Sequence, residues 1–447
     1  MIYDLCIIGA GPAGYVAAER AGHAGMKVIL FDAKALGGVC LNEGCIPTKT
    51  LLYSAKLFEQ AKSAEKYGII CGDVKADFAK IMERKDKIIR KLNAGIAASM
   101  KANKVESAKG KAKLKKRTLE GIQIAVGDQL YEGKNVLICT GSEAAVPPIK
   151  GLDKSSFLTN REILQLKELP GSLNVIGGGV VGIEFASFFN ALGTKVRVME
   201  MADEILPGID REISKMLREE LTQKGIEFHL QAKVTEVRDG EVIFENRGLS
   251  KAPAEQVLVS TGRKLNTEDL GLENINVEYS AKGIVIDHCC RTNVHNVFAA
   301  GDVTGKSLLA HSASRAGEVA VNTMLGKRDR MRYDAIPSVV YANPEIAAVG
   351  LTEETAAKQN IKVKVFKKPL VFAGRFVAEN EGKNGLIKVI AGEKHGEILG
   401  VHMIGNPSSE IIFGACMAIE MQMRVQDIKE IVFPHPTVSE IFKEALF

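Results

Sequence analysis

The sequence lacks any run of apolar residues that approaches the roughly 18 positions needed for a transmembrane helix. No basic, signal-like segment comes before the first strand-like stretch, Tyr3 to Ile8, either. These two absences lead us to expect a cytoplasmic protein with no membrane partner.

Signals for metal and nucleic-acid binding are also missing. The chain has eight cysteines, but no paired CxxC spacings and no paired histidines accompany them, which argues against a zinc site. The most basic run, residues 109–117, contains no aromatic side chain that could stack on a base. We expect this run to form a solvated hairpin, and we expect neither a bound metal nor a nucleic-acid partner.

The chain contains enough residues for about three domains. It has 447 residues, of which 46% are hydrophobic and 25% charged, and 43 glycines, as in a globular protein with many tight turns. An amphipathic helix is expected over residues 78–100. After about Arg332, strands around 361–366 and 386–401 and an apolar helix over about 408–421 indicate an α+β domain without nucleotide motifs.

The first 32 residues have the pattern of a dinucleotide-binding unit. An apolar strand leads into Gly9-Ala10-Gly11-Pro12-Ala13-Gly14, a helix follows to about Ala24, and a second strand ends in Asp32. Glycines at this spacing permit the tight turn, the close approach of a pyrophosphate and the packing of the helix, while the acid accepts ribose hydroxyls. Because strand, turn, helix and acid all occur at the expected spacing, this segment is predicted to bind a dinucleotide.

The same pattern returns in the middle of the chain. A strand precedes Gly177-Gly178-Gly179-Val180-Val181-Gly182, and Glu200 lies 23 residues after Gly177, as Asp32 lies 23 after Gly9. Each unit closes with a similar strand and a Thr-Gly turn, at 140–141 and at 261–262. This internal duplication predicts that one chain holds two different dinucleotides.

Two cysteines in the segment 37–49 suggest which dinucleotide belongs to which unit. Cys40 and Cys45 lie five positions apart, between two glycines and Pro47, which can open a helix whose dipole would stabilise a thiolate. Closing so short a loop removes only ~2 kcal/mol of unfolded-chain entropy, so we predict a redox-active rather than a structural disulfide. Its exchange partner, a flavin, then belongs in the first unit and a nicotinamide in the second, where Glu200 favours NAD over NADP.

Near the C-terminus, His435 stands between two prolines. Histidine titrates near neutrality, so it could act as an acid–base group. A structural interpretation stays open, because Thr437 and Glu440 also have the spacing of a helix capping box.

These motifs resemble those of the class I pyridine nucleotide–disulfide oxidoreductases along nearly the whole chain, and the segment 37–49 is closest to the dihydrolipoamide dehydrogenase branch. The resemblance implies an α/β fold with two Rossmann-like domains, glutathione reductase-like, and a C-terminal α+β dimerisation domain. The implied boundaries are 1–145 for an FAD-binding domain, 146–270 for an NAD-binding domain, 271–332 for a central segment returning to the FAD domain, and 333–447 for the dimerisation domain.

The resemblance also implies roles for individual residues. The catalytic group would be Cys40, Cys45, His435 and Glu440. The FAD site would comprise Gly9, Gly11, Pro12, Ala13, Gly14, Asp32, Ala33, Gly38, Val39, Cys40, Lys49, Thr140, Gly141, Asp302 and Ala310. The NAD site would comprise Gly177, Gly179, Val180, Val181, Gly182, Glu184, Glu200 and Gly262. Lys49 would pair with Glu184 beside the flavin, although without the family Glu184 reads as one exposed helical carboxylate among many.

The implied activity is the oxidation of protein-bound dihydrolipoamide through the disulfide and FAD, with hydride transfer to NAD+. The implied partners are a second copy of the chain, with His435 reaching Cys40 across the homodimer, and lipoyl-bearing proteins of 2-oxo acid dehydrogenase or glycine-cleavage complexes. Two alternatives stay open: an NADPH-dependent, glutathione-type disulfide reductase, and a flavin electron-transfer protein or diaphorase that uses no dithiol.

Overall fold

The computed structural model describes residues 2–238 and 240–447. Their contacts define two compact units. Unit 1 consists of Met1–Thr50, Met82–Ala145 and Gly262–Arg332, and unit 2 of Leu51–Ile81, Val146–Thr261 and Tyr333–Phe447. Two long helices contribute residues to both units, namely α3 (Cys45–Lys62) and α4 (Phe78–Ala102).

A twisted sheet of order β3-β2-β1-β6-β5-β4, with β18 paired to β6, forms the centre of unit 1. Its strands are β1 (Ile2–Ile8), β2 (Val28–Asp32), β3 (Glu106–Lys109), β4 (Ala112–Arg117), β5 (Ile122–Val126), β6 (Gln129–Ile138) and β18 (Val297–Ala299). Strands β3, β2, β1, β6 and β18 pair in parallel, and β5 and β4 continue the sheet antiparallel. In β1, Leu5, Cys6 and Ile7 are fully buried, as expected for a parallel strand covered on both faces.

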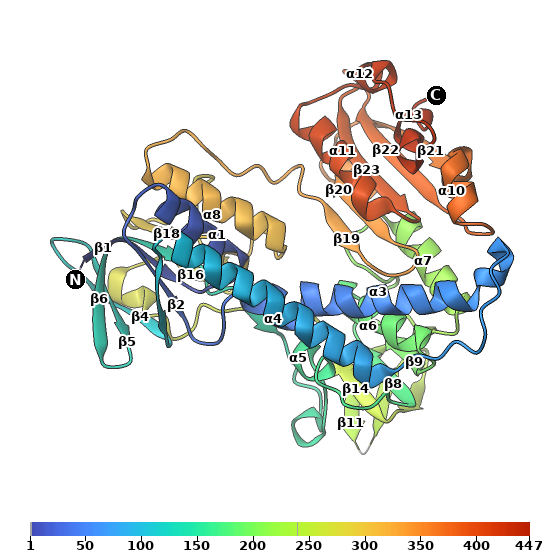
Figure 1. Cartoon of the computed structure of the whole chain (residues 1–447), viewed down its shortest axis with the longest axis horizontal. Helices are drawn as coiled ribbons and strands as arrows, with labels where there is room; N and C mark the ends of the chain where they lie inside the picture. The colour runs from blue at the N-terminus through green and yellow to red at the C-terminus, as the bar shows by residue number, and fades with distance from the viewer. Residues whose placement is uncertain (1, 239) are drawn as a thin grey trace. The chain divides into compact units, whose positions relative to one another are not determined.

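Two helices made largely of small residues pack closely in unit 1, α1 (Pro12–His23) and α8 (Ala310–Met324) (Figure 1). A Cβ on Gly317 would lie only 2.4 Å from the carbonyl oxygen of Ala13, so no side chain fits there. The remaining elements of unit 1 are α2 (Gly38–Glu43), β7 (Ser142–Ala144), β15 (Arg263–Leu265), η3 (Leu272–Ile275), β16 (Tyr279–Ser280), β17 (Gly283–Ile284) and η4 (Asp302–Thr304). Strands β7 and β15 pair antiparallel.

Unit 2 contains a second parallel sheet, of order β10-β9-β8-β14, beside a three-stranded antiparallel sheet, β11-β12-β13. The strands are β8 (Ser172–Ile176), β9 (Lys195–Met199), β10 (Glu227–His229), β11 (Lys233–Arg238), β12 (Glu241–Glu245), β13 (Leu249–Pro253) and β14 (Gln256–Val259). The accompanying helices are η1 (Ala64–Tyr67), η2 (Leu152–Lys154), α5 (Asn160–Ile163), α6 (Val180–Ala191) and α7 (Arg211–Gln223). In the parallel sheet β8 lies between β9 and β14, as β1 lies between β2 and β6 in unit 1.

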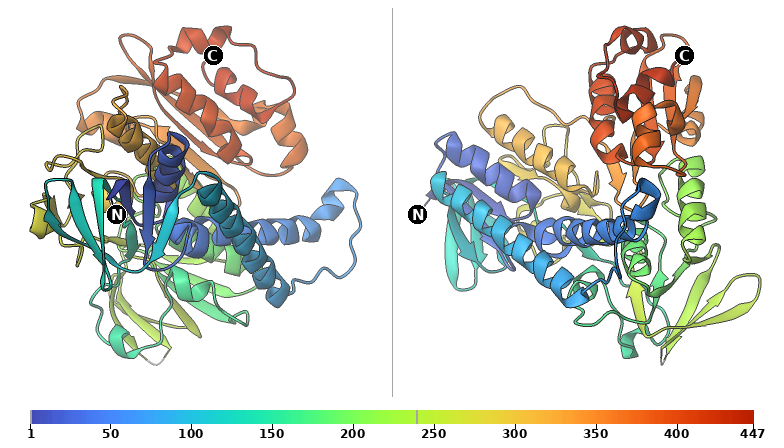
Figure 2. Two further views of the ribbon diagram at one scale, coloured as in Figure 1. Left: turned by 60° about the vertical axis from the view of Figure 1, so that its left-hand side comes forward. Right: turned by 45° about the vertical axis from the view of Figure 1, so that its right-hand side comes forward.

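The C-terminal part of unit 2 is built on an antiparallel sheet of order β19-β20-β23-β22-β21. Its strands are β19 (Ser338–Val340), β20 (Ile346–Gly350), β21 (Val363–Pro369), β22 (Leu386–Gly392) and β23 (Ile398–Ile404). The helices are α9 (Glu353–Lys358), η5 (Leu370–Phe372), α10 (Gly374–Glu379), α11 (Ser408–Glu420), α12 (Val425–Glu430), η6 (Val438–Glu440) and α13 (Ile441–Glu444). Figure 2 shows the red helix α11 near the orange strands, and α11 contacts β20 and β23.

The predicted fold class is confirmed: two Rossmann-like units and a C-terminal α+β region are present. The expected helix over 78–100 extends to Ala102, and the region 386–401 forms two antiparallel strands rather than one extended stretch. Within the basic run 109–117, β4 pairs with β5 and carries exposed lysines, as predicted for a solvated hairpin. Within the described residues, no helix combines the length and apolar character needed to cross a membrane.

Candidate active site

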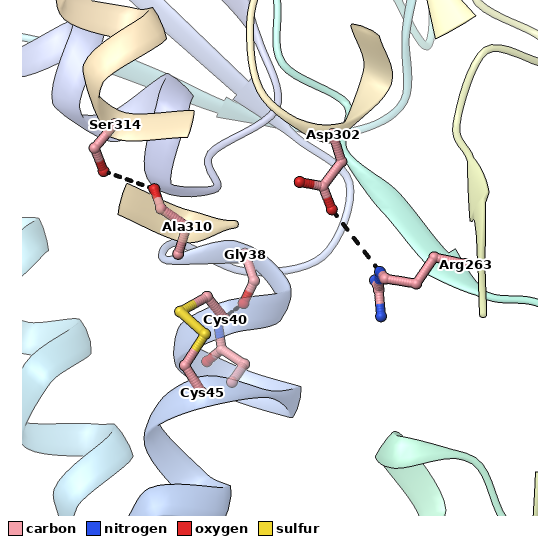
Figure 3. The surroundings of a disulfide bond; sticks show 8 residues. Gly38, Cys40, Cys45, Arg263, Asp302, Ala310 and Ser314 are labelled. Carbon is pink, nitrogen blue, oxygen red and sulfur yellow. Dashed lines mark hydrogen bonds and ion pairs between the residues drawn. A yellow bond between two sulfur atoms is a disulfide. The ribbon is translucent and has the colours of Figure 1, made fainter. Parts of the chain in front are cut away.

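Cys40 and Cys45 form a disulfide in unit 1, shown in Figure 3. Cys40 lies in α2, Gly44 ends that helix, and Cys45 begins α3. Residues five positions apart in one continuous helix would have Cα atoms roughly 8–9 Å apart, but these two Cα atoms lie 4.7 Å apart. The helix break at Gly44 therefore lets the sulfur atoms meet, and the predicted pairing is confirmed.

Gly38 brings the disulfide loop against the first glycine turn. Gly37 and Gly38 have φ of +87° and +61°, in the left-handed region that glycine adopts without strain. A Cβ on Gly38 would lie 2.5 Å from the Cα of Gly11, so the two backbones touch with no room for a side chain. The helix that carries Cys40 and the turn predicted to bind a dinucleotide are direct neighbours.

Asn42 holds α2 in this position. Its Nδ2 donates to the carbonyl oxygens of Leu36 and Gly38, at 2.8 and 2.9 Å, and its Oδ1 accepts from Nδ2 of Asn93 in α4 at 2.8 Å. Nothing in the sequence singled out this residue, because an asparagine inside a short helix carries no motif of its own.

The first glycine turn is shaped for a pyrophosphate. Gly9 has φ of +106°, and a Cβ on Gly14 would lie 1.8 Å from the Gly9 carbonyl oxygen. Gly11 precedes α1 without a side-chain cap, so the first amides of that helix can bind an anion. Asp32 at the end of β2 accepts from the amides of Ala10 and Lys34, at 2.6 and 2.7 Å. These two hydrogen bonds hold the turn in place, and the remaining lone pairs of the Asp32 carboxylate can accept from ribose hydroxyls.

The second turn, in unit 2, repeats this geometry. Gly177 has φ of +107°, and a Cβ on Gly182 would lie 2.2 Å from the Gly177 carbonyl oxygen. Gly179 precedes α6 without a side-chain cap. Glu200 accepts from the amides of Gly178 and Ala202, at 2.6 and 2.7 Å, which are the bonds that Asp32 makes in unit 1. The duplication thus includes the hydrogen bonds of the acid, and both turns fit a dinucleotide.

Asp302, at the start of η4, has a partner that the sequence did not suggest. Its Oδ2 accepts from Oγ of Ser142 at 2.5 Å and lies 3.8 Å from Nε of Arg263 (Figure 3). Ser142 and Arg263 are the residues that directly follow the two Thr-Gly turns, and their strands, β7 and β15, pair with each other. Comparing the positions after the duplicated turns could have revealed this pair.

His435 and Glu440 lie together in unit 2. Nδ1 of His435 is 2.8 Å from Oε1 of Glu440, and Oε2 of Glu440 accepts from the amide of Thr437 at 2.8 Å. The amide of Thr437, and then His435, hold the pKa of Glu440 below its usual value. The two interpretations of this motif are therefore compatible, because one carboxylate both completes the capping box and holds the imidazole.

The other expected site residues divide between the units. Unit 1 contains every residue expected at the FAD site, including Ala33 after β2, Val39 in α2, Lys49 in α3 and Ala310 at the first position of α8. Unit 2 contains the residues expected at the NAD site except Gly262, which belongs to unit 1. Glu184 in α6 is only 2% exposed, and its Oε1 accepts from the amide of Tyr341 at 3.1 Å, so the interpretation as an exposed carboxylate was wrong.

Comparisons with known proteins agree with this geometry. Residues 3–317 match the family model described as pyridine nucleotide-disulphide oxidoreductase, and residues 336–446 match the dimerisation domain of the same family. A dihydrolipoyl dehydrogenase from Geobacillus stearothermophilus is 40% identical over 451 residues, covering 99% of this chain and 95% of that protein. One from Chlamydia muridarum is 37% identical over 447 residues, covering 99% and 96%.

Solved structures show the same similarity. LpdA from Mycobacterium tuberculosis has a TM-score of 0.91 at 26% identity, covering 99% of this chain and 98% of that one. The HOCl-induced flavoprotein disulfide reductase RclA from Escherichia coli has a TM-score of 0.86 at 27% identity, covering 99% of both chains. The Cys40–Cys45 disulfide lies beside the first of two similar glycine turns. The predicted family is confirmed: this chain belongs to the pyridine nucleotide-disulphide oxidoreductases.

Proposed function

We propose that this chain is an FAD-dependent enzyme that oxidises protein-bound dihydrolipoyl groups and reduces NAD+. The observation that carries the proposal is the contact between Gly38 and Gly11, which puts the Cys40–Cys45 disulfide beside the first nucleotide turn. The full-length similarity to dihydrolipoyl dehydrogenases supports the dithiol substrate.

The chain's own residues fit the two cofactors. Gly9, Gly11, Gly14 and Asp32 would hold the pyrophosphate and ribose of FAD, and Asp302 would accept a hydroxyl of its sugar-alcohol chain. When bound, the flavin supplies two-electron chemistry between a thiol and a nicotinamide. By the same assignment, residues 1–145 and 271–332 form the FAD domain, 146–270 the NAD domain and 333–447 the dimerisation domain.

The choice of NAD over NADP follows from the charge at the second turn. Both oxygens of Glu200 accept backbone amides, which fixes the carboxylate where a ribose 2′-phosphate would have to lie. The nearby Arg211 is already paired with Asp203 at 2.8 Å. A 2′-phosphate would therefore meet a fixed negative charge, whereas free ribose hydroxyls would find an acceptor.

The thiol chemistry is assigned to the two cysteines and His435. His435, oriented by Glu440, takes the proton of one substrate thiol, and the thiolate attacks Sγ of Cys40. The Cys40–Cys45 bond breaks, leaving Cys45 as a thiolate at the N-terminus of α3, where the helix dipole stabilises it. The second substrate thiol then displaces Cys40, which releases a cyclic disulfide and leaves both cysteines reduced.

We assign the active enzyme to a homodimer in which His435 of one copy serves Cys40 of the other. The match to a dimerisation domain over residues 336–446 supports this assignment. Lys49 and Glu184 are assigned to the flavin edge, where a cation would stabilise a thiolate at Cys45. Lipoyl-bearing proteins of 2-oxo acid dehydrogenase or glycine-cleavage complexes are the proposed partners.

Anaerobic titration of the purified flavoprotein tests the function. Dihydrolipoamide should change the visible flavin spectrum, and NAD+ but not NADP+ should reverse the change. A Cys45→Ser variant, which keeps the glycine turns, should show no change with dihydrolipoamide and should still react with NADH. No response of the wild type to dihydrolipoamide, combined with reaction with NADPH and a glutathione disulfide, would overturn the assignment of substrate and cofactor together.

A further inference from the structure

The long helix α4 contacts the disulfide segment through the side chain of Asn93. Nδ2 of Asn93 donates to Oδ1 of Asn42 at 2.8 Å, across a sequence separation of 51 positions. Asn42 lies two residues after Cys40 in the short helix α2. A residue that belongs to neither a glycine turn nor the cysteine segment therefore touches the helix that carries Cys40.

The bond from Asn93 determines which way the amide group of Asn42 points. An asparagine amide has an acceptor oxygen at one end and two donor protons at the other. With Oδ1 facing Asn93, Nδ2 of Asn42 donates to the carbonyl oxygens of Leu36 and Gly38, at 2.8 and 2.9 Å. If the amide turned over, its Nδ2 would face the NH2 group of Asn93 and its oxygen would face two carbonyls. All three hydrogen bonds would then be lost together.

These hydrogen bonds matter most when the disulfide is reduced. In the oxidised protein the Cys40–Cys45 bond ties α2 to α3, as Figure 3 shows. α2 has only six residues and no side-chain cap at Gly37, so it is too short to be stable without contacts from the rest of the protein. After reduction, hydrogen bonds and packing alone keep α2 in the orientation that brings Cys40 to Cys45.

A second contact connects α4 to the helix that begins at Cys45. Nη1 of Arg84 donates to the carbonyl oxygen of Thr50 in α3 at 3.0 Å. Arg84 and Asn93 are nine residues apart in α4, which corresponds to about 13 Å along a helix axis. One helix thus contacts both elements that carry the cysteines.

The other end of the Asn93 side chain gives the fold nothing. Its Oδ1 is buried, and none of the described residues donates a hydrogen bond to it. A buried acceptor without a donor lowers the stability of the folded state. The donor end, bonded to Asn42, is therefore the part of Asn93 that favours an asparagine at this position.

We propose that Asn93 is a positioning residue for the redox-active disulfide, a role that rests on the proposed function in requiring the disulfide to open and close during turnover. By orienting the amide of Asn42, Asn93 keeps α2 in place after reduction, so that Cys40 can re-form its bond with Cys45. Losing this orientation lowers the effective concentration of one thiol at the other and shifts the equilibrium towards the dithiol.

Equilibration of the holoenzyme with reduced and oxidised dithiothreitol tests this role without any turnover. Each exchange oxidises one dithiothreitol to its cyclic disulfide, and its two electrons and two protons convert the Cys40–Cys45 disulfide into two thiols. After anaerobic equilibration at several ratios, the thiols are trapped by alkylation and counted by mass spectrometry of the peptide that contains both cysteines.

Asn93→Asp keeps the shape of the side chain but removes its donor. It should make the disulfide roughly twofold to tenfold easier to reduce, as expected for the loss of a neutral hydrogen bond, which is a shift of about 9–30 mV. Asn103→Asp is the matched control. Nδ2 of Asn103 donates to the carbonyl oxygen of Ser99 at 3.0 Å, near the end of α4, so this change should leave the equilibrium as in the wild type.

A double-mutant cycle separates orientation of the amide from the effect of the new charge. In an Asn42→Ala background, Asn93→Asp should cause no further shift, because the amide that it orients is gone. The same shift in that background, or a wild-type equilibrium in Asn93→Asp, would overturn the inference. If Asn93→Asp fails to fold, Asn93→Ala, which also removes the buried Oδ1, decides in the same assay. Failure of the wild type to oxidise dihydrolipoamide would refute the proposed function but would leave this equilibrium measurable.

Discussion

Replacing Lys388 with methionine should destabilise the chain far more than replacing its neighbour Lys367. Lys388 lies in β22 with a side chain only 3% exposed, and Lys367 lies opposite it in β21. Nζ of Lys388 is 2.7 Å from Asp210, 2.6 Å from Glu353 and 3.2 Å from Glu212. Burial by itself lowers the pKa of Lys388, but the hydrogen bonds to Asp210 and Glu353 outweigh it and raise the pKa overall.

The size of the effect follows from the exposure of the three carboxylates. Glu212 and Glu353 are each 42% exposed, so water can solvate both carboxylates when the lysine is gone. Their ion pairs with Lys388 therefore contribute little to the loss of stability. Asp210 is 4% exposed and would be left as a buried charge, for which the described residues supply only the amides of Glu212 and Ile213 as donors. Removing one partner of a buried ion pair lowers the free energy of unfolding by about 3–5 kcal/mol.

Urea unfolding at a fixed FAD concentration measures the difference, because bound cofactor itself shifts apparent stability. Lys367→Met is the matched control: its side chain is 44% exposed, and it contacts Glu212 at 2.6 Å, so its loss should cost less than about 1 kcal/mol. Asp210→Asn keeps the cap of α7 while removing the charge. The double variant with Lys388→Met should therefore recover most of the lost stability.

Two results would refute this reasoning. Equal urea midpoints for Lys388→Met and Lys367→Met would show that water or a structural rearrangement stabilises the Asp210 charge when the lysine is absent. A double variant that is less stable than Lys388→Met alone would show that the lysine acts by packing rather than by neutralising the aspartate.

Three further predictions concern the site and its pH dependence. Cys40→Ser and Cys45→Ser should abolish dihydrolipoamide oxidation but keep FAD and NADH-to-dye activity; loss of FAD from both would mean that the cysteines are structural. Glu440→Gln should slow flavin reduction by dihydrolipoamide roughly tenfold to a hundredfold in stopped flow and leave reduction by NADH unchanged; equal slowing of both would contradict an acid–base role for His435. Burial holds the pKa of His402 below the usual value of about 6.5, so the unfolded chain protonates first and stability should fall as the pH drops below about 6.5. His402→Gln can keep the hydrogen bond to the Leu351 carbonyl, and it should reduce the difference between the urea midpoints measured at pH 7.5 and pH 5.5. The same difference in the variant as in the wild type would show that His402 does not cause the loss of stability at low pH.

The duplicated units could be predicted because each of their signals is local. Gly9 and Gly177 must adopt positive φ, and Gly14 and Gly182 must lie against the carbonyls of those residues, so the spacing of the turn is visible within six residues. The disulfide was predictable for the same reason, since its two cysteines and the helix break at Gly44 fall within one short segment.

What could not be predicted depends on contacts between distant segments. Ser142 and Arg263 are separated by 121 positions and meet only because β7 and β15 pair. Glu184 stands on a helix whose pattern does not reveal that Tyr341 covers it, 157 positions away. Lys388 interrupts an apolar strand in a way that the sequence cannot distinguish from an exposed edge position, and its partner Asp210 is 178 positions away.

Lys388 and Arg263 show how such contacts can be assigned to stability or to ligand binding. The network of Lys388 is closed, because Oδ2 of Asp210 accepts from the lysine and Oδ1 accepts from the amides at the start of α7. Arg263 donates to Oγ of Ser142, and Ser142 donates to Oδ2 of Asp302. Oδ1 of Asp302 accepts from none of the described residues. A network in which every carboxylate oxygen has a protein donor can only stabilise the folded state, so removing Lys388 should lower the free energy of unfolding with or without FAD. A network that leaves one oxygen for a ligand can also contribute to binding, so removing Arg263 should lower the affinity for FAD before it lowers stability.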